Sequence, residues 1–132
     1  MHASAAKTAL LGLLLMVTPS AWAEWVKVGE SGQVNKVDHY INFPTVRIDG
    51  NFRKFWVLQD GKQQRGGALS FRARLEIDCK EERIRLLALS SHTGPMATGD
   101  FVSDESRIRE WREIAPGSID STYQRLVCSL IP

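Results

Sequence analysis

The chain has 132 residues, with 17 Lys or Arg against 15 Asp or Glu, so its formal net charge is only +2. This balance argues against a dedicated nucleic-acid binder, which usually carries a strong basic excess. The length suits one domain behind a short export signal and leaves no room for a second domain.

Residues 1–23 have the pattern of a secretory signal peptide. A weakly positive start with Lys7 precedes the apolar run Ala9 to Val17, and Ala21-Trp22-Ala23 offers a small-x-small cleavage pattern. This run is much shorter than the roughly 20 residues that a membrane-spanning helix needs. We therefore expect no transmembrane helix, a mature domain over residues 24–132, and export to the periplasm or the cell surface.

Several short strands are predicted in the first half of the mature chain. Asp49-Gly50-Asn51 is a strong hairpin signal between two of them, and Lys62 to Gly67 is polar enough to be an exposed loop. The expected strands cover residues 24–28, 34–42, 45–48 and 52–58.

A long hairpin from Leu69 to Ser91 is the clearest element. Apolar and charged residues alternate along its first strand, so one face of the strand is apolar and the other is charged. One face carries Phe71, Ala73, Leu75, Ile77 and Cys79, and the other carries Arg72, Arg74, Glu76 and Asp78. With Glu81-Glu82 as a two-residue turn, the predicted pairs are Cys79 with Ile84, Ile77 with Leu86, Leu75 with Ala88, and Asp78 with Arg85.

The chain after the hairpin ends in a helix. Residues 94–99 form a turn, Phe101-Val102 is a short strand, and residues 107–114 fit helix and strand equally well. Ser118 offers an N-cap for a helix from Ile119. Because Cys128 lies off the apolar stripe of this helix, we expect the helix to end near Val127.

Cys79 and Cys128 are the only cysteines. In an exported protein an even pair most simply forms a disulfide. Metal ligation or a reactive thiol is the alternative, although neither cysteine has a C-x-x-C spacing. Closing a loop of about 50 residues would stabilise the fold by about 4 kcal/mol.

These elements predict an α+β fold: an antiparallel β-sheet with a C-terminal helix packed on one face and tied to it by the disulfide. The opposite face carries three arginines beside leucines, a mixture too apolar for a solvated surface and too charged for a core. We identify it as a candidate binding or dimer face, with surface arginines that only cover apolar neighbours as the alternative. Its residues are Arg72, Arg74, Arg85, Leu87 and Leu89.

No catalytic pattern stands out. The mature chain has two histidines, His39 and His92, and neither has ligand-type spacing to another His or Cys. A Gly-x-Ser-x-Gly elbow and a phosphate-binding loop are both absent from the sequence. We therefore predict a non-enzymatic protein without metal or cofactor.

Several motifs occur together in an order that resembles the surface-adhesin protein E family of Gram-negative bacteria. They are His39-Tyr40-Ile41-Asn42, Ser70-x-Arg72, Ile77-Asp78-Cys79, Gly94-Pro95-Met96-Ala97-Thr98-Gly99, Ile114-Ala115-Pro116-Gly117-Ser118 and Leu126-Val127-Cys128. The resemblance implies an antiparallel sheet with a disulfide-tied helix, a homodimer, and binding of host matrix or serum proteins such as vitronectin and laminin. A periplasmic housekeeping or inhibitor module is the second interpretation, because no cysteine stands at the predicted cleavage point for a lipid anchor.

Overall fold

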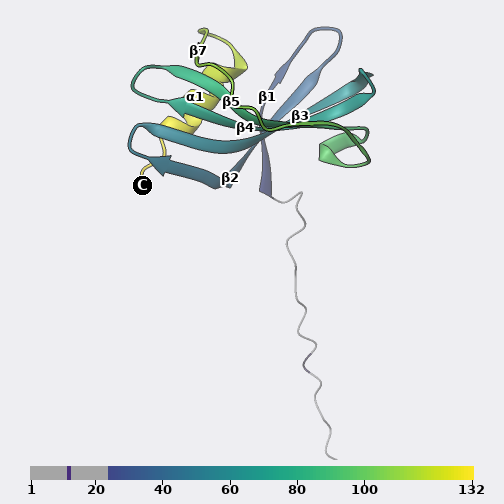
Figure 1. The fold of residues 1–132 in the computed structure, drawn as a ribbon, viewed down its shortest axis with the longest axis horizontal. Coiled ribbons are helices and arrows are strands. Elements are labelled where there is room, and N and C mark those ends of the chain that lie inside the picture. Colours follow the sequence, from purple (N-terminus) through teal and green to yellow (C-terminus); the bar gives the residue numbers. More distant parts are fainter. Residues whose placement is uncertain (1–11, 13–23) are drawn as a thin grey trace, which may run out of the picture.

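A computed structural model describes residue 12 and residues 24–132 of the chain (Figure 1). Apart from Gly12, the predicted signal peptide lies outside the described residues. The elements are β1 (Trp25–Ser31), β2 (Val37–Asp49), β3 (Phe52–Arg65), β4 (Ala68–Asp78), β5 (Arg83–His92), the 3-10 helix η2 (Pro95–Ala97), β6 (Phe101–Glu105), β7 (Arg112–Glu113) and α1 (Ile119–Cys128).

The strands form one antiparallel sheet in the order β1-β2-β3-β4-β5-β6, and β7 pairs with the far end of β5. Every neighbour in this order is also the next strand along the chain, so hairpins make all the connections. The predicted antiparallel sheet with a C-terminal helix is therefore confirmed. Among residues 12 and 24–132, no helix is long and apolar enough to cross a membrane.

The observed strands are longer than predicted, most clearly at two places. Residues 34–42 and 45–48 were expected as separate strands, but β2 runs through Phe43-Pro44 with an irregularity between Asn42 and Arg47. The expected loop from Lys62 to Gly67 is mostly strand. Gly66 and Gly67 alone make the turn with φ of 57° and 81°, a backbone region that two consecutive glycines enter at no steric cost.

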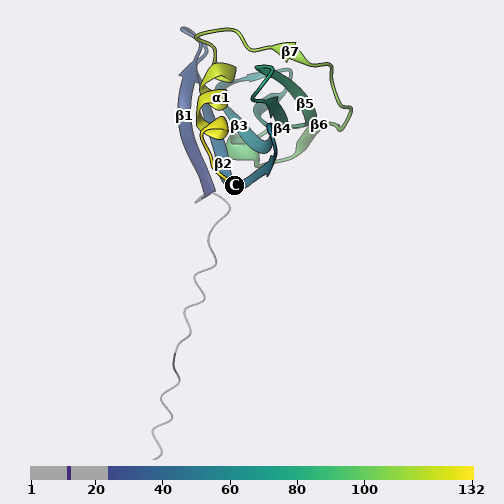
Figure 2. The same cartoon turned by 90° about the vertical axis from the view of Figure 1, so that its left-hand side faces the viewer.

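The core lies between α1 and one face of the sheet, which we call the inner face. Figure 2 shows α1 inside the curl of the sheet, beside β1, and the segment with β7 arching from β6 back to the helix. Phe55 and Ile77 of the sheet are fully buried, as are Tyr123 and Val127 of α1 to within 1%. β1 comes so close to the helix that a Cβ on Gly29 would lie 2.9 Å from Ile119 Cδ1.

The β4–β5 hairpin has a different register from the predicted one. Ile77 pairs with Ile84 and Leu75 with Leu86, because the turn contains four residues, 79–82, rather than two. The Asp78 carboxylate accepts hydrogen bonds from the backbone N–H groups of Lys80 and Glu81, both at 3.2 Å. This capping of the wider turn makes the predicted Asp78–Arg85 pair wrong. The observed pairing is shifted by two residues from the predicted one, so near the turn each side chain stays on the predicted face of the hairpin.

A β-bulge farther along β5 changes the faces again. Arg74 pairs with Ala88 and Leu75 with Leu86, so Leu87 is an extra residue without a partner among the described residues of β4. Beyond the bulge, Leu89 lies opposite Ala73 and packs against the core. The prediction that Leu89 shares the face of the arginines is therefore wrong.

The helix and its disulfide follow the prediction closely. The Ser118 side chain accepts a hydrogen bond from Ser121 N at 3.2 Å, which confirms the N-cap. The Cys79–Cys128 disulfide joins the hairpin turn to the last turn of the helix, with 5.9 Å between the two Cα atoms. The helix extends one residue beyond the expected end, through Cys128 itself.

Candidate functional site

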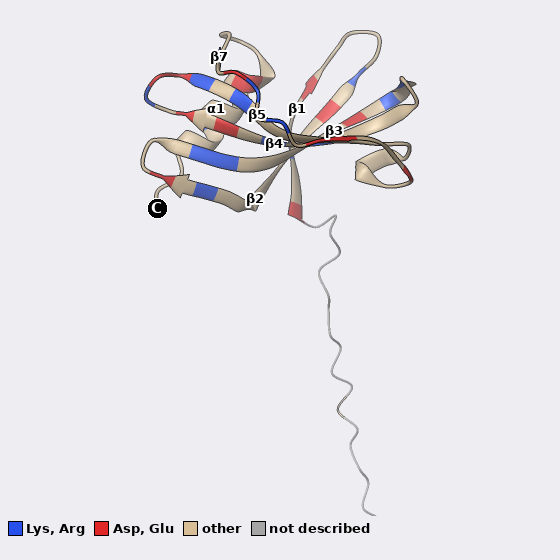
Figure 3. Cartoon of the chain, viewed as in Figure 1, with Lys and Arg blue, Asp and Glu red and all other residues tan. Residues whose placement is uncertain are grey.

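The face of the sheet turned away from α1, which we call the outer face, carries all three predicted arginines. Arg72 and Arg74 lie on it because they alternate along β4 with the core residues Ala73 and Leu75. Arg85 joins them because it pairs with Glu76 on the same face. Figure 3 shows basic segments on β2, β3 and β5 in the half of the sheet drawn at the left.

Arg85 belongs to a neutralised part of this face. Its guanidinium contacts the buried Glu76 carboxylate at 2.6 Å, and Arg83 contacts Asp78 at 3.2 Å in the same way. The Trp111 ring covers both cations, with its centroid 4.6 Å from the Arg83 guanidinium carbon and 4.3 Å from that of Arg85. Each charge therefore has an ionic partner and an aromatic cover.

Trp111 lies beside the candidate arginine face, a position that the sequence analysis did not predict. Its segment fitted helix and strand equally well, and in the structure only Arg112–Glu113 within it is strand. The ring also contacts Phe52, with centroids 6.1 Å apart, so it spans the outer face from β5 to β3. No local pattern predicts this contact, because it depends on how the chain returns from β6.

The other part of the outer face has cations without ionic partners. Arg47, Arg72 and Arg74 form no ion pair within the described part of the chain. The Arg72 guanidinium carbon lies 4.9 Å from the Trp56 ring centroid. A hollow of about 320 Å³ is lined by Arg47, Trp56 and Arg74 together with Pro44, Thr45 and Val46. We call Arg47, Trp56, Arg72 and Arg74 the arginine patch.

The 3-10 helix η2 closes the opposite end of the outer face. Ser70 Oγ donates to Gly94 O at 2.6 Å and accepts from Ala97 N at 2.8 Å. Asp60 accepts from Met96 N at 2.9 Å. These bonds hold η2 over β3 and β4, so η2 covers that end of the outer face and leaves the arginine patch accessible.

His39 occupies a structural position between β1 and α1. Its Nε2 lies 2.6 Å from Ser31 Oγ, and its Nδ1 lies 3.2 Å from Tyr123 Oη. Burial lowers the pKa of His39 and raises the pKa of Tyr123, so both groups are neutral around pH 7. The third group is a tyrosine rather than the carboxylate of a hydrolytic triad, and His39 lines neither of the two cavities described for residues 24–132.

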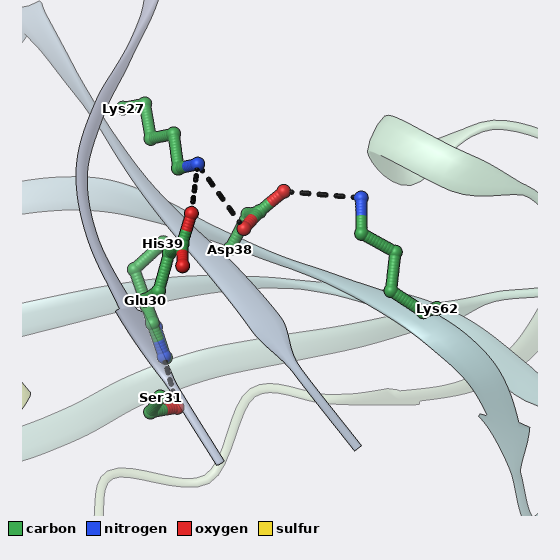
Figure 4. A network of polar contacts seen from close by, with 6 residues as sticks. All are labelled: Lys27, Glu30, Ser31, Asp38, His39 and Lys62. Atoms are coloured by element: carbon green, nitrogen blue, oxygen red, sulfur yellow. Dashed lines mark hydrogen bonds and ion pairs between the residues drawn. The ribbon is translucent and has the colours of Figure 1, made fainter. Parts of the chain in front are cut away.

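Asp38, next to His39, faces the other side of β2 and holds two lysines. Lys27 Nζ lies 3.3 Å and Lys62 Nζ 3.2 Å from its carboxylate oxygens, and Figure 4 shows the two lysines on either side of Asp38. Burial pushes the pKa of Asp38 upward, but the hydrogen bonds and charges of Lys62 and Lys27 outweigh it, so the pKa is below its ordinary value. The carboxylate therefore joins β1, β2 and β3.

His92 is equally structural. Its Nε2 lies 2.8 Å from Ser90 Oγ, and its ring packs against Phe101 with the centroids 4.9 Å apart. Burial lowers its pKa. Within residues 12 and 24–132, no group of three or more His, Cys, Asp or Glu side chains has the geometry of a metal site.

Comparison with known proteins identifies the family. The model of the surface-adhesin protein E family matches residues 25–129, so the chain belongs to this family. The resemblance seen in the sequence motifs is thereby confirmed, and membership indicates an exported or surface protein that binds other proteins. No curated protein sequence matches the chain.

Solved structures show the same fold. The selenomethionine form of Haemophilus influenzae protein E aligns with a TM-score of 0.63 and 11% identity, over 81% of this chain and 87% of that chain. Protein E from non-typeable H. influenzae aligns with a TM-score of 0.59 and 10% identity, over 84% of this chain and 79% of that chain. At this identity the likeness establishes the fold alone.

Proposed function

We propose that this chain is a non-enzymatic surface adhesin domain that binds an acidic segment of a host matrix or serum protein through the arginine patch. Family membership supports the adhesin class. The observation that carries the choice of site is a contrast on the outer face. Arg83 and Arg85 are ion-paired, whereas Arg47, Arg72 and Arg74 form no ion pair with any residue that the structure describes.

The arginine patch suits carboxylate ligands for two reasons. A guanidinium presents donors in a planar fork that matches a carboxylate in a bidentate contact. Stacking on Trp56 restrains Arg72 before any partner arrives, which lowers the entropy cost of binding. Tryptophan and arginine are also the residues that most often dominate binding energy at interfaces.

The charges also bear on the predicted homodimer. In a two-fold symmetric dimer the same surface of each copy meets, so a contact centred on the patch would bring unpaired arginines together. That repulsion favours a different chain as the partner of the patch. We therefore propose that any homodimer forms through another surface and leaves the patch accessible.

Binding of the mature domain, residues 24–132, to immobilised vitronectin and laminin at physiological salt tests the proposal. We expect saturable binding that R72E/R74E weakens at least tenfold, since each reversal replaces attraction by repulsion. The matched control is K36E/R125E, two exposed cations away from the patch with the same change in net charge. Equal loss in both double variants would show a general charge effect, and no saturable binding by the parent would refute the adhesin proposal.

Sedimentation equilibrium of the same proteins tests the dimer. A dimer that persists in R72E/R74E supports a separate dimer surface, whereas its loss in that variant alone would place the patch in the dimer contact. Cell fractionation tests the location: full release by osmotic shock would support the periplasmic module instead of a surface adhesin.

A further inference from the structure

The inner face is not fully covered by α1. Beside the helix, the sheet forms the floor of a groove of about 1040 Å³, at the top of the range of roughly 300–1,000 Å³ that is usual for small-ligand sites. The floor comes from β3, β4 and β5 and is apolar except for Gln59 of β3. Its apolar residues are Val57, Phe71, Ala73, Leu75, Leu86 and Leu89.

One wall of the groove is the irregular segment between β6 and β7. Residues 107–112 line the groove, and the backbone bond from Arg109 N to Leu86 O, at 2.9 Å, attaches the segment to β5. Ile108 in this wall is 58% exposed. An apolar side chain that borders an apolar floor and is still in water would gain contacts from a ligand with a hydrocarbon part.

The rim of the groove is basic. Four arginines line the groove against two carboxylates, Glu110 and Asp120. Arg109 is neutralised by Glu105 at 2.7 Å and Arg112 by Asp120, but Arg65 and Arg107 form no ion pair with any described residue. An apolar floor with unpaired cations above it suits a molecule with a hydrocarbon chain and an anionic head.

We propose that this groove is a binding site for a single-chain anionic amphiphile of the fatty-acid class. The acyl chain lies on Phe71, Leu86 and Leu89, the half-buried residues of the floor, and the carboxylate pairs with Arg65 or Arg107. A polar polyanion would leave the floor without a partner, and a neutral hydrocarbon would leave the arginines without one. The site is on the opposite side of the sheet from the arginine patch, so it does not depend on the proposed function.

Isothermal titration of the mature domain with laurate, below its micellar concentration, tests the site. We expect saturable binding of one laurate per chain. Decanoate, with two methylenes fewer, should bind about 16-fold more weakly, since each buried methylene contributes about fourfold in affinity. Dodecyltrimethylammonium, which has a hydrocarbon chain of similar length and the opposite charge, should bind at least tenfold more weakly than laurate. Equal affinity for both head groups, or binding without saturation, would overturn the proposal.

Variants locate the ligand. R65Q/R107Q should weaken laurate binding at least tenfold without changing the melting temperature, because neither arginine has an ionic partner to lose. I108S should weaken it by a smaller factor, and its exposed position avoids a folding defect. R72Q/R74Q, on the outer face, is the matched control and should bind laurate as the parent does. Equal loss in the two double variants, or methyl NMR shifts that avoid Leu86 and Leu89, would refute this location.

Discussion

The two faces of the sheet differ in composition and in their contacts. Along β4, Arg72 and Arg74 point outward while Ala73 and Leu75 point inward. The inner face joins the helix, the disulfide and the core, so its residues hold the fold together. The outer face carries ion pairs and cation–π contacts, and we propose that its arginine patch serves recognition. From Arg72 to Leu75, the alternation of side chains thus places core residues next to residues proposed for binding.

This comparison predicts large stability losses for changes on the inner side and small ones on the outer side.

Removal of the disulfide should have the largest effect. C79S/C128S frees a loop with a sequence separation of 49 and should lower the free energy of unfolding by about 4 kcal/mol. Urea unfolding of the mature domain measures the loss. A change below about 1 kcal/mol would show that the helix is held to the inner face by packing alone.

Arg53 should be next, because its buried guanidinium completes the end of α1. It donates from Nε to Val127 O at 3.1 Å and from Nη2 to Leu130 O at 3.3 Å. R53M removes these bonds to the Val127 and Leu130 carbonyls at the end of α1 and should cost about 2–3 kcal/mol in urea unfolding. R53K keeps the charge near the helix end and should recover part of the loss. Full stability of R53M would contradict the role of these bonds.

Acidification should weaken the fold through His39 and His92. Burial lowers the pKa of both in the folded state, so only the unfolded state takes up protons as the pH falls through about 6.5. Stability is therefore complete above that pH and decreases below it, by at most about 1.4 kcal/mol per pH unit for each histidine. Below about pH 4, Asp38 adds a loss, since its pKa is lowered in the folded state. Thermal unfolding between pH 7.5 and 5 checks the loss due to the histidines. H39Q should reduce the dependence of stability on pH in this range.

The smallest change in stability is expected for R72E/R74E. Neither arginine has an ionic partner among residues 24–132, so the free energy of unfolding should stay within about 0.5 kcal/mol of the parent while partner binding falls. Thermal unfolding and binding, measured on the same preparation, check both halves of this prediction. A large stability loss would show that the arginine patch holds the fold and would remove the distinction between the faces.

Sequence reasoning reached the faces of β4, the helix with its Ser118 cap and the Cys79–Cys128 pair, because each depends on local spacing or on a count of two cysteines. Sequence reasoning failed where a turn or a bulge changes the pairing of residues farther along a strand. The four-residue turn depends on capping by Asp78, and the bulge at Leu87 moved Leu89 from the outer to the inner face. Alternation alone contains no signal for a bulge, because the pattern assumes an unbroken ladder.

The sequence by itself determined the class of fold and the two faces of β4, since side-chain period and covalent cross-linking are properties of the chain. Only the tertiary structure decided which arginines are available. Arg85 and Arg72 have the same local pattern, yet Trp111 and Glu76 cover and neutralise the first while the second stays unpaired. The tertiary structure also decides that the groove is open. Its floor comes from three strands, and its exposure depends on how far a ten-residue helix reaches across them.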